Sequence, residues 1–221
     1  MRILLILGCF LVAGLWLAPI SVGADASSAT DRAEHLETSL QAVEWYTNEA
    51  VRKALQAEST GDIANAKLFG NKAIESDLKA QGLRNETAAA WQAAGKPANA
   101  HATWHRAADM AKERAAMLDK RIAPLKSQWR MDSGKALPAE QEHEILYLQA
   151  VFLTAQQWAL VIGFYISAAE PDQAQAAIEQ LQTLLPPLQR NNRLTALAAD
   201  PRLAGSVEQL QAWQKLVSSS H

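Results

Sequence analysis

The stretch Thr60-Gly61-Asp62-Ile63-Ala64-Asn65-Ala66 returns in altered form as Ala94-Gly95-Lys96-Pro97-Ala98-Asn99-Ala100. The similarity extends over residues 50–82 and 84–116, which also pairs Ala54 with Ala88 and Ala73 with Ala107. The two segments are offset by 34 residues. A fixed period of this size predicts stacked supersecondary units rather than one compact catalytic fold. Stacked helical units present surfaces for binding partners.

The remainder of the chain also favours helix. The 221 residues include only 10 Gly and 8 Pro, and the β-branched alternation typical of strands is almost absent. We therefore predict an all-α protein whose short connections make neighbouring helices pack antiparallel. Gly82 and the pair Pro186-Pro187 are expected to end helices. The predicted helices cover about 31–58, 64–80, 86–94, 97–122, 139–168, 172–185, 194–198 and 207–217.

Each repeated segment is expected to be a helix, a glycine turn and a second helix. Gly61 and Gly95 permit a left-handed turn, and the shared alanines let helices approach closely. This pattern resembles the tetratricopeptide repeat, whose period is 34 residues. A third unit at 155–187 matches by motif rather than by period, through Trp158, Val161, Ile162, Tyr165, Ala174, Ile178, Leu181 and Pro186. The resemblance implies a short array that acts as a protein-binding scaffold; an irregular helical bundle is the alternative.

The N-terminus has the pattern of a secretory signal. A basic start at Met1-Arg2 precedes an uncharged apolar run from Ile3 to Val22, and small residues follow around Ala24. We predict a signal peptide over residues 1–24, a flexible leader over 25–30 and one helical domain over 31–221. The protein is then periplasmic or secreted. An uncleaved signal anchor is the alternative, because the apolar run approaches the length that spans a bilayer.

Composition excludes several classes of function. Cys9 is the only cysteine and lies in the signal, so the mature chain has no disulfide and no thiolate metal site. Lys and Arg number 21 against 23 Asp and Glu, without the clustered basic footprint of nucleic-acid binding. No nucleophile with a partner base and no phosphate loop is visible. We therefore expect neither nucleic-acid binding nor enzymatic activity, and no cofactor.

Two histidines are the best candidates for a metal site. His101 and His105 are four residues apart on a predicted helix, and Asp109 continues the same face one turn later. Imidazole pairs at this spacing chelate Zn or Cu, and a carboxylate adds a third ligand. The alternative is that both histidines are surface residues beside Trp104. Their pattern therefore makes a periplasmic metal- or cofactor-binding bundle the second candidate function.

The partner-binding surface is predicted near Trp104, with His101 and His105 beside it. Trp129 is a further candidate, since it lies in a less regular stretch. Tryptophan is enriched at binding hot spots, although core packing is its default role in helix pairs. The predicted partner is another envelope or secreted protein, and the predicted function is that of a non-enzymatic exported scaffold or accessory protein.

The uncharged segment 145–169 has the length of a membrane span, but its internal glutamines favour a central core helix. Within it, Leu153-Thr154-Ala155-Gln156-Gln157 matches the LTxxQ motif of small periplasmic chaperones. The resemblance implies chaperone activity as another alternative.

Overall fold

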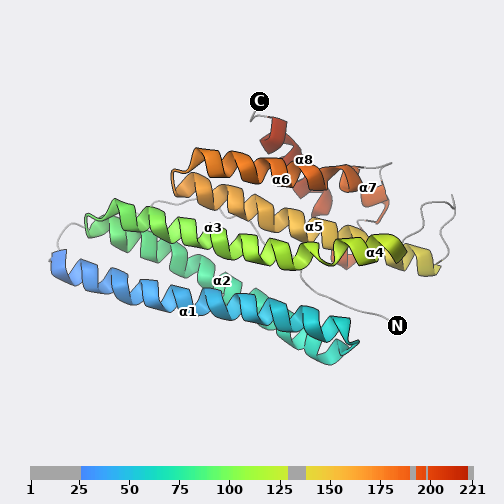
Figure 1. Cartoon of the computed structure of the whole chain (residues 1–221), viewed down its shortest axis with the longest axis horizontal. Helices are drawn as coiled ribbons and strands as arrows, with labels where there is room; N and C mark the ends of the chain where they lie inside the picture. Colours follow the sequence, from blue (N-terminus) through green and yellow to red (C-terminus); the bar gives the residue numbers. More distant parts are fainter. Residues whose placement is uncertain (1–25, 129–137, 190–192, 198, 219–221) are drawn as a thin grey trace. The chain divides into compact units, whose positions relative to one another are not determined.

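The computed structural model describes residues 26–128, 138–189, 193–197 and 199–218. These residues form helices and contain no strand, which confirms the predicted all-α class. Along the chain the helices are α1 (Ala26–Ser59), α2 (Ile63–Ala93), α3 (Pro97–Asp119), α4 (Ile122–Gln128), α5 (Pro138–Ser167), α6 (Pro171–Gln189), α7 (Arg193–Leu197), the 3₁₀ helix η2 (Pro201–Leu203) and α8 (Ser206–Ser218) (Figure 1). The predicted signal peptide and Trp129 lie outside the described residues.

The described residues form two compact units. The first unit contains residues 26–110 and 164–170, and the second contains 111–128, 138–163, 171–189, 193–197 and 199–218. Helices α3 and α5 therefore contribute residues to both units. The prediction of a single domain over residues 31–221 remains a prediction. Helix α1 begins five residues before the expected start at Asp31, so it includes most of the predicted leader.

The first unit is built on the long antiparallel pair α1 and α2 (Figure 1). A cluster of small side chains around Trp91 includes Ala33 of α1, Ala88 of α2 and Ala100 of α3, and Trp104 packs against it. Small residues let the helix axes approach closely, as the sequence predicted for the shared alanines. Polar contacts continue along the same interface, where Thr47 Oγ1 donates to Ser76 Oγ at 3.0 Å.

Tight turns with a residue in the left-handed region connect these helices. Gly61 has φ 75° between α1 and α2, and Gly95 has φ 70° between α2 and α3. After Gly95, the Lys96 N–H donates to the Trp91 carbonyl at 2.9 Å, while the Gly95 N–H donates to Gln92. This pattern is the Schellman motif that closes helix C-termini. The 34-residue similarity therefore marks two successive turns and the helix starts that follow them.

A third turn of the same kind lies between α5 and α6. Ala169 has φ 59°, and the Glu170 N–H donates to the Tyr165 carbonyl at 2.9 Å. Pro171 then opens α6, as Pro97 opens α3. The third predicted unit at 155–187 thus shares the turn geometry, with alanine in place of glycine. The arrangement is compatible with a helical repeat, and no repeat family is confirmed by it.

Two predicted helix ends were wrong. Helix α2 runs through Gly82, so the separate helices predicted at 64–80 and 86–94 are one. A glycine inside a helix costs only about 1 kcal/mol, which the long packed interface with α1 outweighs. Helix α6 likewise continues through Pro186 and Pro187. Its buried residues Leu185 and Leu188 flank the prolines and hold this last turn against the core.

The second unit packs around α5. The Phe152 ring lies 5.4 Å from that of Trp213 in α8, and Arg114 Nε donates to Gln157 Oε1 at 3.0 Å. Arg202 of η2 donates to Glu142 at 2.5 and 2.9 Å and to Asp200 at 2.8 and 2.7 Å, which fastens the C-terminal helices to α5. These bonds from Arg202 hold the pKa of Glu142 and of Asp200 below the usual range.

Helix α5 contains the one stretch of the described residues, Glu142–Ser167, that is long and apolar enough to cross a membrane. Most of this stretch is buried within the protein, as in the core helix of a soluble fold.

Candidate functional site

The predicted site residues on α3 lie in the first unit, where the structure brings two of the three proposed metal ligands together. His105 Nε2 is 3.4 Å from Asp109 Oδ2, one helical turn further along. His101 lies one turn in the other direction and is exposed. The i, i+4 spacing thus brings His105 and Asp109 into contact, while the predicted metal site stays a prediction.

The third group beside His105 is Glu170, from the turn that follows α5. Nδ1 of His105 lies 2.8 Å from both carboxylate oxygens of Glu170. The imidazole thus has a carboxylate at each ring nitrogen. A neutral ring carries one N–H and donates to one of them, whereas a protonated ring donates toward both.

Tyr165 completes this group of side chains. It is buried, its hydroxyl donates to Asp109 Oδ1 at 3.3 Å, and its ring lies edge-on to His105 at 5.8 Å. We call His105, Asp109, Tyr165 and Glu170 the His105 cluster. Its members join α3 to the last turn of α5 and the loop behind it.

The His105 cluster is poorly arranged for a metal ion. A metal binds the lone pair of one imidazole nitrogen, and the other nitrogen then donates to an outer group. Here the two carboxylates lie at opposite nitrogens, so they cannot both join the same ion with His105. Within the described part of the chain, no group of three His, Cys, Asp or Glu side chains is arranged to hold a metal.

An aromatic stack lies next to the His105 cluster. The Trp104 ring is stacked on Phe164, with centroids 5.9 Å apart and planes inclined by 23°. The guanidinium of Arg84 lies 5.0 Å from the centroid of the same Phe164 ring. Two residues further on, Ile166 is 60% exposed. We call the exposed and half-buried side chains of α3 and of residues 164–170 the α3 surface, to which Ile166 contributes from a different face of α5 than Phe164.

Buried ion pairs support this region from inside the unit. Arg84 Nε donates to Glu44 Oε1 at 2.9 Å, and Arg84 Nη2 donates to Asp77 Oδ1 at 3.3 Å, with all three side chains buried. Arg106, one residue after His105, pairs with Glu37 and lies 3.4 Å from Glu44. Helix α3 is thereby tied to α1, which fixes the direction in which its outer side chains project.

Within this network, the surroundings of the Glu37 carboxylate shift its pKa. Burial alone would raise the pKa of Glu37, but hydrogen bonds from Arg106, Trp91 and Thr103 outweigh burial and lower that pKa. Trp91 Nε1 donates at 3.2 Å and Thr103 Oγ1 at 2.9 Å to the same oxygen. Glu37 therefore stays ionised in the folded protein under ordinary conditions.

Sequence reasoning missed Tyr165, Phe164 and Glu170 as site residues. The signal that was available is the third turn, since Ala168-Ala169-Glu170-Pro171 aligns with Ala94-Gly95-Lys96-Pro97. That alignment places Glu170 directly after a reversal of the chain.

Comparison with protein-family models, with curated proteins and with solved structures finds no match to this chain.

Proposed function

We propose that this protein is an exported, non-enzymatic scaffold that binds another envelope or secreted protein through the α3 surface. The observation that carries the proposal is the half-buried Trp104–Phe164 stack next to the His105 cluster, with Ile166 60% exposed on the same turn of α5 as Phe164. Binding hot spots combine an aromatic anchor with surrounding groups that exclude water. The rigid stack supplies such an anchor, and the charged cluster supplies a polar rim.

The geometry favours binding over catalysis. A histidine acting as a general base needs one ring nitrogen within reach of the proton it removes. Both nitrogens of His105 are engaged by carboxylates, and in the described ranges no hydroxyl nucleophile is hydrogen-bonded to it. Export is supported by the sequence of residues 1–24 alone.

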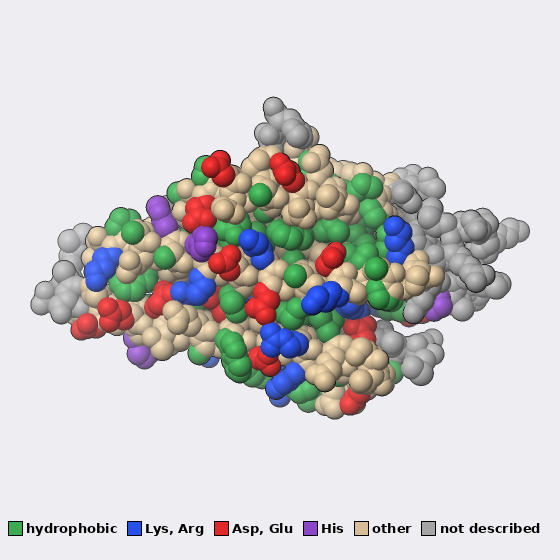
Figure 2. Space-filling view, viewed as in Figure 1, with side chains coloured by type: hydrophobic (Ala, Val, Ile, Leu, Met, Phe, Trp, Pro, Cys, Tyr) green, Lys and Arg blue, Asp and Glu red, His purple; other side chains and the backbone are tan. Residues whose placement is uncertain are grey.

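The charge distribution supports a protein partner rather than a nucleic acid. On the face shown in Figure 2, Lys and Arg side chains are interspersed with Asp and Glu, without a gathering of one sign. Nucleic-acid surfaces concentrate Lys and Arg because they must neutralise phosphates. Mixed charges at the edge of an apolar region are typical of protein interfaces.

The proposal is tested by capture of the partner from an envelope fraction, followed by mass spectrometry. The variant Ile166→Asp places a charge at an exposed apolar side chain of the α3 surface and should lower capture of a specific partner at least tenfold, because burying an unpaired carboxylate is unfavourable. The variant Trp104→Ala should do the same.

Leu68→Asp is the matched control, since Leu68 is 47% exposed on α2 of the same unit but is outside the α3 surface. It should leave capture unchanged. Equal capture by Ile166→Asp and the wild-type protein, with both folded by circular dichroism, contradicts the proposal.

A metal- or cofactor-binding bundle is the second candidate, favoured only by the contact of Asp109 with His105, because Glu170 lies at the other ring nitrogen. Elemental analysis of the purified protein, before and after incubation with Zn or Cu, tests it. If the wild-type protein binds metal stoichiometrically and His105→Ala does not, the metal-binding function is favoured over the scaffold function.

A further inference from the structure

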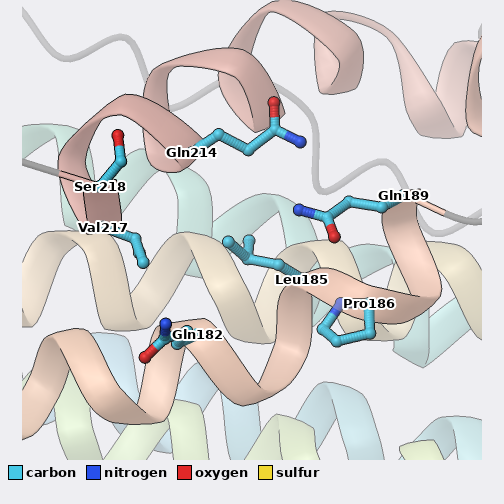
Figure 3. A pocket seen from close by; sticks show the side chains of 7 residues that line it. All are labelled: Gln182, Leu185, Pro186, Gln189, Gln214, Val217 and Ser218. Atoms are coloured by element: carbon cyan, nitrogen blue, oxygen red, sulfur yellow. The ribbon is translucent and has the colours of Figure 1, made fainter.

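A groove lies between α6 and α8 in the second unit (Figure 3). Its volume is about 360 Å³, within the range of about 300–1,000 Å³ that small-ligand sites occupy. Leu185 and Val217 are buried and form its floor. Among the described residues, the groove is also lined by Gln182, Pro186, Gln189, Gln214 and Ser218.

The rim of the groove carries three side-chain amides with unused hydrogen-bonding capacity. Gln189 of α6 and Gln214 of α8 extend toward the space between the two helices (Figure 3). Over the described residues, the amides of Gln182, Gln189 and Gln214 form no hydrogen bond with the protein. Each amide offers a carbonyl acceptor and two N–H donors.

The prolines of α6 leave two backbone carbonyls of that helix without their usual helical donor. Pro186 and Pro187 have no N–H, so the carbonyls of Gln182 and Thr183 lack the donor that a helix normally supplies four residues on. Gln182 itself lines the groove. Ser218 donates its hydroxyl hydrogen to the Lys215 carbonyl at 3.0 Å, which leaves the hydroxyl oxygen as an acceptor.

The lining selects an uncharged ligand with amide groups. None of the lining residues that the structure describes is charged, so an ionic ligand would lose its hydration there without a counter-charge. A sugar ring can lay its C–H face on Leu185 and Val217, but it has no aliphatic side chain to fill the space between them. An extended peptide places an aliphatic side chain on this floor and directs its backbone N–H and C=O groups at the rim.

We infer that the groove between α6 and α8 binds an extended, uncharged peptide segment that carries one aliphatic side chain. Leu185, Pro186 and Val217 hold the aliphatic side chain, and the glutamine amides pair with the peptide backbone. The inference stands apart from the proposed function, because it uses residues of the second unit only. Loss of peptide binding leaves partner capture through the α3 surface unaffected, and the reverse also holds.

The test is an NMR titration of the ¹⁵N-labelled protein with the capped peptide acetyl-Ala-Leu-Ala-amide. Saturable shifts are expected for the side-chain amides of Gln182, Gln189 and Gln214. Three other probes are compared: the same peptide with its leucine nitrogen methylated, acetyl-Ala-Glu-Ala-amide, and methyl glucoside. All three should bind more weakly, the methylated peptide by about fivefold for one lost hydrogen bond.

The double variant Gln189→Ala/Gln214→Ala should weaken binding of the leucine peptide by more than about fivefold. Gln180→Ala/Gln211→Ala is the matched control, since both glutamines are exposed on the same helices but do not line the groove. The inference is overturned if the leucine peptide gives no saturable shift up to its solubility limit. Tighter binding of the glucoside or the charged peptide, or equal loss in the control, overturns it as well.

Discussion

At the scale of single residues, Glu37 shows how a partly buried charge affects stability. Its pKa is lower in the folded protein than in the unfolded chain, because Arg106, Trp91 and Thr103 all donate to its carboxylate. The folded state therefore binds fewer protons than the unfolded state near this pKa. The stabilisation by Glu37 is fully present above the ordinary pKa of a glutamate and is lost as the pH falls through the lower, folded value.

We predict that Glu37→Gln lowers the free energy of unfolding at neutral pH by about 1–3 kcal/mol, since charge-assisted hydrogen bonds become neutral ones. The variant should also lose less stability than the wild-type protein when the pH is lowered from about 5 to about 3. Urea denaturation at several pH values measures both effects. Glu34→Gln, an exposed change on the same helix, is the control and should keep the wild-type pH profile. Parallel pH profiles for Glu37→Gln and the wild-type protein would contradict the prediction.

The residue scale is also where sequence reasoning reached its limit. The pair His105 and Asp109 followed from helical spacing, because residues four apart lie on one face whatever the tertiary structure. The partners Tyr165 and Glu170 are more than fifty residues away along the chain. Their approach to His105 depends on how α3 and the end of α5 pack. A single sequence carries no direct signal for such a contact.

At the scale of elements, the turns repeat more faithfully than the helices do. The three turns at Gly61, Gly95 and Ala169 share a positive φ, while their flanking helices differ in length. A positive φ is a property of the turn itself and favours glycine, so Gly61 and Gly95 mark two of these turns in the sequence. Helix continuation through Gly82 or Pro186 depends on packing with other helices, and the sequence rules for helix ends therefore failed there.

Ala169 provides a test of this turn geometry, because the left-handed region is less favourable by about 1–2 kcal/mol for a non-glycine residue. We predict that Ala169→Gly raises the free energy of unfolding by about 0.5–1 kcal/mol, part of the relief being offset by the greater freedom of glycine in the unfolded chain. The reverse change, Gly95→Ala, should lower the stability by about 1 kcal/mol, although an added Cβ would have open space around it.

Thermal unfolding followed by circular dichroism measures both variants. The free energy of unfolding should rise in Ala169→Gly and fall in Gly95→Ala. A change in the same direction for both would mean that the φ angle does not determine the conformational cost of these turn residues.

At the scale of the whole molecule, each unit buries charged side chains of its own. The first unit buries the ion pairs of Glu44, Asp77 and Arg84, and the second buries Arg114 and Glu144 near the neutral glutamines Gln149 and Gln157. Breaking a buried pair is costly because the remaining charge stays desolvated. Replacing one buried arginine of the first unit should therefore lower the free energy of unfolding far more than breaking a surface ion pair does.

Arg84 is the residue that tests this in the first unit, since it contacts Glu44 of α1, Asp77 of α2 and the Phe164 ring. We predict that Arg84→Met lowers the free energy of unfolding by about 3–5 kcal/mol, a large share of the total for a small protein. Arg52→Met, which removes a pair with Glu49 on the exposed side of α1, should cost less than about 1 kcal/mol.

Native-state hydrogen exchange then shows where the stability is lost. Because Arg84 and all its partners belong to the first unit, amide protection in Arg84→Met should fall in α1 and α2 and persist in α6 and α8. An equal loss in α6 and α8 would mean that the two units unfold as one cooperative body. A loss no larger than that of Arg52→Met would mean that Arg106, which also approaches Glu44, is sufficient to neutralise the buried carboxylate.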